Sequence, residues 1–259
     1  MIMKKLLGKR ALVTAGAQGI GLSITRQLLA AGADVFVHYR SSAAAARAVE
    51  PEAGSLGRRY GHASADLTET EGCNELVAVA AQFLGGIDVL INNAGSLVGR
   101  KGFAEADDAF WMEVMSLNVG SMRRVSRAAL PHLAAAAKTG GGASIVNLSS
   151  LAGRKGGHSG SLVYSTAKGA ILTFTRALAS ELGPQGIRVN ALAPGLILGT
   201  SFHNTHTTKQ SADATVASIP LGRGGSADDV ARAAVFLASE YDGFITGATL
   251  DINGGVYGC

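Results

Sequence analysis

A tyrosine and a lysine four residues apart are the side chains in this sequence best suited to do chemistry. Tyr164 and Lys168 lie in the stretch YSTAK. On a helix, positions four apart share one face, so the phenol and the ammonium would point into one space. A nearby ammonium favours the phenolate, which would make the pair an acid–base device. The same spacing is also typical of two solvent-facing side chains that have no chemical role.

The composition restricts the class of protein. The 259 residues carry a net charge of +4, with 23 basic and 19 acidic side chains, and a chain of this length can bury a sizeable core. Cys73 and Cys259 lie too far apart for a disulfide framework or a metal site, so we expect no metal and a cytoplasmic location. No run of 18 apolar residues occurs and the basic residues are scattered, so neither a membrane nor a nucleic acid is an expected partner.

Short apolar runs alternate with helical patterns along the whole chain. This order predicts a parallel sheet covered by helices on both faces, with ligands bound at the carboxyl ends of its strands. Pro51 is expected to stop one helix, and Ser226 with Asp229 to cap another. We expect strands at 10–15, 34–39, 58–66, 87–93, 143–150, 187–193 and 248–253, and helices at 20–32, 42–51, 74–85, 105–118, 125–138, 166–183 and 226–239.

The residues directly after the first two expected strands suit a dinucleotide. TAGAQGIG at 14–21 places three glycines before a helix, where backbone N–H groups could approach a pyrophosphate. The alternative is a tight strand-to-helix turn with no ligand. YRSS at 39–42 carries Arg40 and two hydroxyls where an acidic residue would favour NAD. Arginine suits a 2′-phosphate, so the stretch favours NADP unless Arg40 is simply solvated.

Further motifs follow in order: NNAG at 92–95, LSS at 148–150, YSTAK at 164–168 and VNALAPG at 189–195. Together with TAGAQGIG and the carboxyl-terminal ITGATLDINGG, they make the chain resemble the short-chain dehydrogenase/reductase family over about residues 8–256, and in particular its 3-oxoacyl-(acyl carrier protein) reductases. The resemblance implies a single-domain α/β fold over 1–259, a Rossmann-like doubly wound parallel sheet of about seven strands. The cofactor-binding half would span about 8–150 and the catalytic and substrate half about 143–259, with a lid at about 198–220.

The resemblance also implies roles for individual residues. Tyr164 would donate or accept the proton, and Lys168 would hold the nicotinamide ribose and lower the pKa of the tyrosine. Ser150 would position the substrate oxygen, and Asn118 would hold a helix kink and a water. The cofactor would be NADP, with NAD possible, and the implied cofactor-binding residues are Gly16, Gln18, Gly19, Ile20, Gly21, Tyr39, Arg40, Ser41, Asp66, Leu67, Asn93, Ala94, Gly95, Tyr164, Lys168, Pro194, Gly195 and Ile197.

Some positions depart from the family pattern. Ala15 stands where a glycine is usual, and we expect Gly16 beside it to adopt the unusual backbone conformation. Thr200 comes one position late, which puts its usual contact with the cofactor carboxamide in question. The interval from Ser150 to Tyr164 is one residue longer than usual, so the loop at 154–163 is expected to bulge.

The sequence indicates an NADP-dependent oxidoreductase that transfers hydride between a nicotinamide and a carbonyl or secondary alcohol, of the 3-oxoacyl-thioester reductase type. Gln185, where such enzymes often have a cation, argues against a carrier-protein substrate and leaves a sugar, polyol or small ketone as the alternative. A non-catalytic nucleotide-sensing module is a third, weaker hypothesis. We expect a small-molecule substrate, a homotetramer or homodimer, and a substrate region bordered by three histidines, His158, His203 and His206.

Overall fold

The computed structural model describes residues 6–200, 208–239 and 243–258. Its centre is a seven-stranded sheet in the order β3-β2-β1-β4-β5-β6-β7, and every pair of neighbouring strands is parallel. The chain therefore winds outward in both directions from β1 and β4, and the single-domain, Rossmann-like doubly wound prediction is confirmed. The strands are β1 Arg10–Val13, β2 Asp34–Tyr39, β3 Tyr60–Ser64, β4 Val89–Asn92, β5 Ala143–Leu148, β6 Ile187–Pro194 and β7 Thr249–Ile252.

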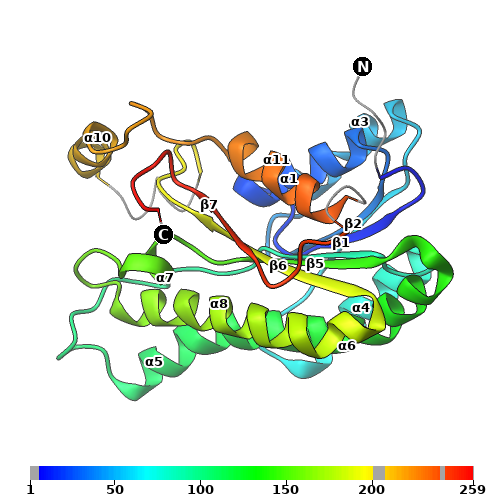
Figure 1. Cartoon of the computed structure of the whole chain (residues 1–259), viewed down its shortest axis with the longest axis horizontal. Helices are drawn as coiled ribbons and strands as arrows, with labels where there is room; N and C mark the ends of the chain where they lie inside the picture. The colour runs from blue at the N-terminus through cyan, green and yellow to red at the C-terminus, as the bar shows by residue number, and fades with distance from the viewer. Residues whose placement is uncertain (1–5, 201–207, 240–242, 259) are drawn as a thin grey trace.

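Helices cover both faces of this sheet (Figure 1). Helices α1 and α11 pack on one face, and α4, α6 and α8 pack on the other. The helices are α1 Gly19–Ala30, α2 Ala43–Arg47, α3 Glu50–Ser55, α4 Thr70–Leu84, α5 Asp108–Met115, α6 Ser121–Ala136, α7 Ala152–Lys155, α8 Leu162–Leu182, α10 Lys209–Ala217 and α11 Ala227–Ala238, with π-helical turns at Ser116–Gly120 and Ala137–Gly141 and a 3₁₀ turn at Gly183–Gln185. None of the helices in the described residues is both long and apolar enough to cross a membrane.

The apolar strands feed two separate core layers. Val13, Val37 and Ile91 pack toward α1 and α11, whereas Leu12 and Leu90 pack toward α4 and α6. Successive side chains of a strand point to opposite faces, so a sheet covered on both sides needs apolar residues at every position. This requirement explains the nearly continuous apolar runs in the sequence.

A buried polar chain joins the central strands to α8. Asn147 on β5 accepts a hydrogen bond from Asn92 Nδ2 of β4 at 2.9 Å and donates one to Thr175 Oγ1 of α8 at 3.0 Å. Asn147 and Thr175 are fully buried. Because unpaired polar atoms in such a layer are costly, these bonds favour a single position of α8 along the sheet.

Several element boundaries differ from the sequence-based expectations. Helix α8 begins at Leu162, four residues before the expected start, so Tyr164 and Lys168 share one helix. The helix expected at 42–51 does stop near Pro51, since α2 ends at Arg47, but Pro51 itself does not end it. Pro51 lies in the first turn of α3, where its missing N–H costs nothing. The cap of α11 is confirmed, since Ser226 and Asp229 form a reciprocal capping box.

Candidate active site

The carboxyl end of β5 is tied directly to α8. Lys168 Nζ donates a hydrogen bond to the carbonyl of Leu148, the last residue of β5, at 2.8 Å. In the reverse direction, Ser149 Oγ donates to the carbonyl of Lys168 at 2.7 Å. Lys168 is only 4% exposed. The two bonds fix the ammonium beside Ser149 and Ser150, where β5 ends.

Tyr164 lies one turn before Lys168 on the same helix and beside Ser150. Lys168 Nζ lies 5.6 Å from the centroid of the Tyr164 ring. Burial raises the pKa of Tyr164 to about 12, and a hydrogen bond with Ser150 lowers it in part. The expectation that Lys168 lowers the pKa of the tyrosine is therefore wrong for the protein alone. The penalty for burying a phenolate dominates, so the phenol stays protonated.

Burial acts in the opposite direction on Lys168. It lowers the pKa of the ammonium to about 8, because the charged form loses hydration. Near neutral pH the site therefore holds a neutral phenol beside an ammonium close to its own titration point. A proton is held at the phenol oxygen, and the charge of Lys168 depends strongly on what it contacts.

Asn118 sits in the π-helical turn between α5 and α6 and is fully buried. Its Nδ2 donates to the carbonyls of Ser96 and Val114 at 2.8 and 2.9 Å, and its Oδ1 accepts from Ser96 N at 3.2 Å. A Cβ on Gly95 would lie 2.6 Å from Asn118 Oδ1 and 3.1 Å from Lys168 Nζ. The structure thus brings Asn118 and Lys168 together on either side of a position that only glycine fits. The helix deviation at Asn118 is present, while its role in holding a water stays a prediction.

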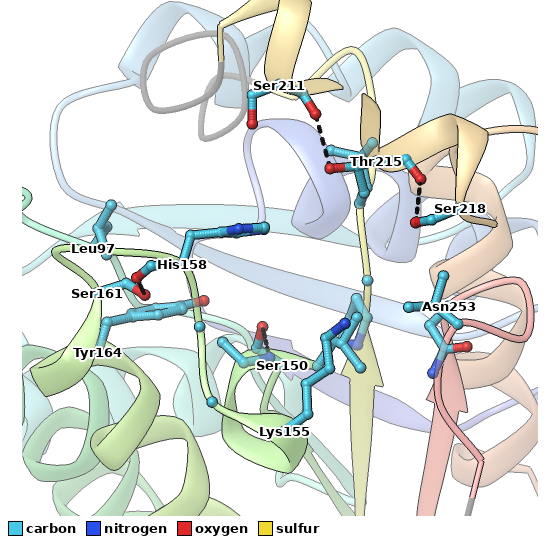
Figure 2. A pocket seen from close by; sticks show the side chains of 18 of the residues that line it. Leu97, Ser150, Lys155, His158, Ser161, Tyr164, Ser211, Thr215, Ser218 and Asn253 are labelled. Atoms are coloured by element: carbon cyan, nitrogen blue, oxygen red, sulfur yellow. Dashed lines mark hydrogen bonds between the residues drawn. The ribbon is translucent and has the colours of Figure 1, made fainter. Parts of the chain in front are cut away.

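Two cavities meet at Tyr164. The larger is about 450 Å³ and runs from Ser150 and Tyr164 toward α7 and α10. The smaller is about 200 Å³ and runs toward the glycine-rich turn after β1. Ser150, Tyr164, Pro194 and Gly195 line both cavities. Figure 2 shows the larger one, with the hydroxyls of Tyr164 and Ser150 directed into the hollow.

The smaller cavity collects many of the predicted cofactor-binding residues. Its walls include Gln18, Gly19, Ile20, Asn93, Gly95, Tyr164, Lys168, Pro194, Gly195 and Ile197. Thr200 also lines it, with its Oγ1 donating to the carbonyl of Ile197 at 3.0 Å. These residues come from the ends of β1, β4, β5 and β6, which is where a doubly wound sheet binds its ligand.

The amino end of α1 fits a pyrophosphate. Gln18 precedes the helix and forms no side-chain cap, so the first-turn N–H groups face the cavity without one. Gly19 has a φ of +53°, and a Cβ on Gly21 would collide with the carbonyl of Ala15. These two glycines keep the backbone open where a nicotinamide dinucleotide would lie.

Ala15 adopts the left-handed backbone conformation in this turn. The φ of Ala15 is +49°, whereas Gly16 does not have a positive φ. The prediction that Gly16 would adopt that conformation is therefore wrong. Gly16 is needed for a different reason, because a Cβ there would lie 3.0 Å from side chains of Val13, Thr25 and Val37.

The remaining predicted residues lie beyond the smaller cavity, at the ends of β2, β3 and β4. Arg40 is largely exposed and pairs with Asp66 at 3.7 Å. Two hydrogen bonds from Thr68 lower the pKa of Asp66. Tyr39 and Ala94 are half-buried and Ser41 is exposed, whereas Leu67 is buried in the apolar layer below α4.

His38 was not anticipated from the sequence. It is 3% exposed, its Nδ1 accepts from the N–H of Ala15 at 3.1 Å, and its Nε2 lies 3.1 Å from the carbonyl of Ala65. Because Nδ1 accepts, the ring proton must sit on Nε2 and be donated to Ala65. Burial lowers the pKa of His38, which keeps this neutral form. The only sequence signal was a polar residue inside the apolar strand DVFVHY.

Of the three histidines expected near the substrate, His158 lines the larger cavity. His203 and His206 lie outside the described residues. No three His, Cys, Asp or Glu side chains gather into a metal site within the described ranges.

With this geometry in view, comparison with known proteins identifies the family. Residues 14–257 match the family model described as enoyl-(acyl carrier protein) reductase. Nodulation protein G of Azospirillum brasilense is 37% identical, covering 96% of this chain and 98% of that protein. Acetoacetyl-CoA reductase of Rhizobium meliloti is 36% identical, covering 97% and 99%. A short-chain dehydrogenase structure from Burkholderia cenocepacia in complex with NADP is 34% identical with a TM-score of 0.88, covering 97% and 99%.

The chain belongs to the short-chain dehydrogenase/reductase family and is an oxidoreductase that resembles its 3-oxoacyl-(acyl carrier protein) reductases. Similar solved structures hold NADP, NADPH or NAD. The nicotinamide cofactor expected from the sequence is consistent with these complexes and with the glycine-lined cavity beside α1.

The bridge made by His38 should support cofactor binding. His38→Phe removes both ring hydrogen bonds and leaves the N–H of Ala15 without its acceptor, so we expect the KM for NADPH to rise by about tenfold, as for a lost buried hydrogen bond. Steady-state kinetics at saturating carbonyl substrate measure this change. His62→Phe, the same change on the neighbouring strand, should leave the KM for NADPH nearly unaltered. Equal effects of the two substitutions would contradict the bridge.

The two shifted pKa values predict the pH dependence of reduction. As pH rises through about 8, Lys168 loses its charge while Tyr164, with a pKa of about 12, keeps the proton that reduction consumes. The kcat/KM for carbonyl reduction should therefore fall above about pH 8. In Lys168→Arg the guanidinium stays charged, so the fall should move to much higher pH. A fall at the same pH in both proteins would assign it to another group.

Proposed function

We propose that the protein is an NADP-dependent carbonyl reductase, which reduces a ketone to a secondary alcohol. The observation that carries this proposal is the position of Tyr164. Its hydroxyl lies where a glycine-lined cavity, suited to a dinucleotide, meets a second cavity large enough for a small substrate. A protonated phenol at this junction can deliver a proton to an oxygen bound on one side while the reacting carbon faces the other.

Each residue of the site has a separate role in this proposal. The nicotinamide, when bound, supplies the hydride. Tyr164 holds the proton that the developing alkoxide takes up, and burial keeps that proton on the phenol until it is needed. Ser150, hydrogen-bonded to Tyr164, stabilises the same oxygen. Lys168 supplies positive charge. Asn118 donates a hydrogen bond to the carbonyl of Ser96 and so holds the loop after β4 close to Lys168.

Two substrate classes follow from different observations. The relatives named as acetoacetyl-CoA reductase and 3-oxoacyl-(acyl carrier protein) reductase favour a 3-oxoacyl thioester. The larger cavity is also compatible with a small polar carbonyl compound, because two cations and several hydroxyl groups are set among its apolar lining residues. The lack of a cation at Gln185 weakens docking of an acyl carrier protein, whereas a free thioester remains compatible with the site.

A homodimer or homotetramer and a cytoplasmic location stay predictions. On α5 and α8, Trp111, Met112 and Leu162 are 37%, 63% and 44% exposed. Apolar side chains exposed on neighbouring helices are what a contact between subunits would cover.

Tyr164→Phe tests the function itself. With NADPH, the wild-type enzyme should reduce a neutral diketone such as 2,3-butanedione, and also acetoacetyl-CoA if thioesters are substrates. The variant should lose about 10² to 10⁴-fold in kcat, the usual worth of a positioned proton donor, while still binding NADPH by fluorescence titration. Tyr60→Phe, which removes a hydroxyl that donates to the carbonyl of Ala46, is the matched control. Full activity of Tyr164→Phe would exclude the proposed chemistry.

Arg40 should decide the choice of cofactor. Arg40→Ala removes the cation at the end of β2 and leaves Asp66 nearby, so a 2′-phosphate would lose its partner and keep a repelling neighbour. We expect the KM for NADPH to rise by about tenfold or more, the usual scale for a lost charge-assisted contact, and the KM for NADH to change little. Arg47→Ala, at the end of α2, serves as a control for general surface charge. Equal rises for both cofactors would refute a phosphate contact.

A further inference from the structure

The larger cavity is cationic. Among the described residues that line it, Arg100 and Lys155 carry positive charge, His158 adds a ring nitrogen, and neither aspartate nor glutamate occurs. The whole chain has 19 acidic residues against 23 basic ones, so the composition does not require this asymmetry. A cavity whose charged side chains are all cations attracts an anionic ligand and disfavours a cationic one.

Lys155 is held in place by its neighbour. Arg154, the residue before it on α7, pairs with Asp251 of β7 through two bonds of 3.0 and 3.1 Å. Asp251 is thereby paired with Arg154 and not with Lys155. The ammonium of Lys155 forms no hydrogen bond or ion pair with the described part of the chain, and it points into the hollow beside Ser150 (Figure 2). A fixed backbone and an uncommitted charge suit an anion-binding group.

His158 and Arg100 also line this cavity. The ring of His158 extends across the cavity from the loop that follows α7, above the hydroxyl of Tyr164 (Figure 2). Arg100 Nη1 donates to the carbonyl of Ser159 in that loop at 3.0 Å, which holds a guanidinium at the rim. A substrate whose carbonyl lies at Tyr164 would thus have its remaining groups between Lys155, His158 and Arg100.

The part of the cavity wall formed by α10 and the residue after it presents hydroxyl groups. Thr215 Oγ1 donates to the carbonyl of Ser211 at 2.8 Å, and Ser218 Oγ donates to the carbonyl of Thr215 at 2.7 Å. Each hydroxyl donates its hydrogen bond to a backbone carbonyl of the same segment, so it can only accept hydrogen bonds from a ligand in the cavity. Such acceptors suit hydroxyl groups of a ligand, while Leu196, Ile219 and Val256 supply apolar surface to the same cavity.

We propose that the substrate is a small hydroxylated ketone that carries one anionic group, and that Lys155 is the residue that selects for this group. The proposal rests on the reductase function given above and specifies its substrate class. A carboxylate and a phosphate share the chemistry that Lys155 recognises. Lys155 is a specificity residue here, because it binds the part of the substrate that does not react.

Three six-carbon ketones test the proposal with NADPH: 5-keto-D-gluconate carries a carboxylate, D-fructose 6-phosphate a phosphate, and D-fructose no charge. We expect one of the anionic ketones to have a kcat/KM at least about tenfold above that of fructose, the usual scale for a charge-assisted contact. A preference for either anion supports the proposal and identifies the anionic group. A preference for fructose, or no preference, overturns it.

Lys155→Gln shows whether this residue is responsible. The KM for the preferred anionic ketone should rise by about tenfold with little change in kcat, because a contact remote from the reacting carbon contributes equally to the bound substrate and the transition state. The kinetics with fructose should not change, and Lys155→Arg should restore the preference. Lys209→Gln, which removes a cation on α10 outside the cavity lining, controls for general charge. Equal effects of Lys155→Gln on charged and neutral ketones would overturn the assignment.

Reduction of the neutral diketone 2,3-butanedione tests the reductase function independently of the anion site. Reduction of butanedione without discrimination among the three sugars overturns the anion site and leaves the reductase function intact. Failure to reduce any carbonyl compound, including butanedione, overturns the function on which the anion site depends.

Discussion

The site depends on the attachment of α8 to the end of β5. Lys168 bonds to Leu148, Ser149 bonds back to Lys168, and Asn147 bonds to Thr175 two turns further along the helix. These polar links fix both the position of α8 along the strand and its rotation about its own axis. Tyr164 can then meet Ser150 only in one arrangement. The apolar core holds the helix against the sheet, but nondirectional packing alone would tolerate a small slide or turn.

Burial and charge oppose each other in this arrangement. The same desolvation that raises the pKa of Tyr164 lowers the pKa of Lys168, so burial keeps the phenol neutral and brings the ammonium closer to losing its proton. A reductase benefits from a proton kept on the phenol, whereas oxidation of an alcohol would require that proton to leave first. Ser150 moderates this effect, since its hydrogen bond lowers the pKa of the phenol in part. Burial of the pair therefore keeps the phenol in the protonated form that reduction requires.

The sequence predicted the architecture well because its signals were local and repeated. Apolar runs of strand length alternated with helical patterns, and small or polar residues followed each strand, which placed the predicted site at one edge of the sheet. Asn118, Ser150, Tyr164 and Lys168 were assigned from motif resemblance, and the structure brings Ser150, Tyr164 and Lys168 to one cavity, with Asn118 beside Lys168 across Gly95.

The errors came from properties that depend on contacts distant in sequence. The pKa of Tyr164 is set by the burial of the whole site, which the spacing of two residues does not contain. The backbone of Ala15 is supported by His38, 23 residues away, so the residue types within the turn pointed to the wrong position. The cationic cavity lining was not anticipated, because it brings together Arg100 and Lys155, which precede and follow β5. Pro51 could end one helix or begin another, and only the packing of α3 decides between these roles.

The hydrogen bonds of His38 connect the residues after β3 to the glycine-rich turn before α1. In the part of the chain that the structure describes, β3 pairs with β2 alone, and an edge strand opens more easily than the centre of a sheet. Since His38 links Ala65, just beyond β3, to Ala15, fraying of that edge and loosening of the turn are coupled equilibria. Such coupling is reciprocal. We therefore expect a nucleotide that orders the turn to slow amide hydrogen exchange along β3, one of the two edge strands of the sheet.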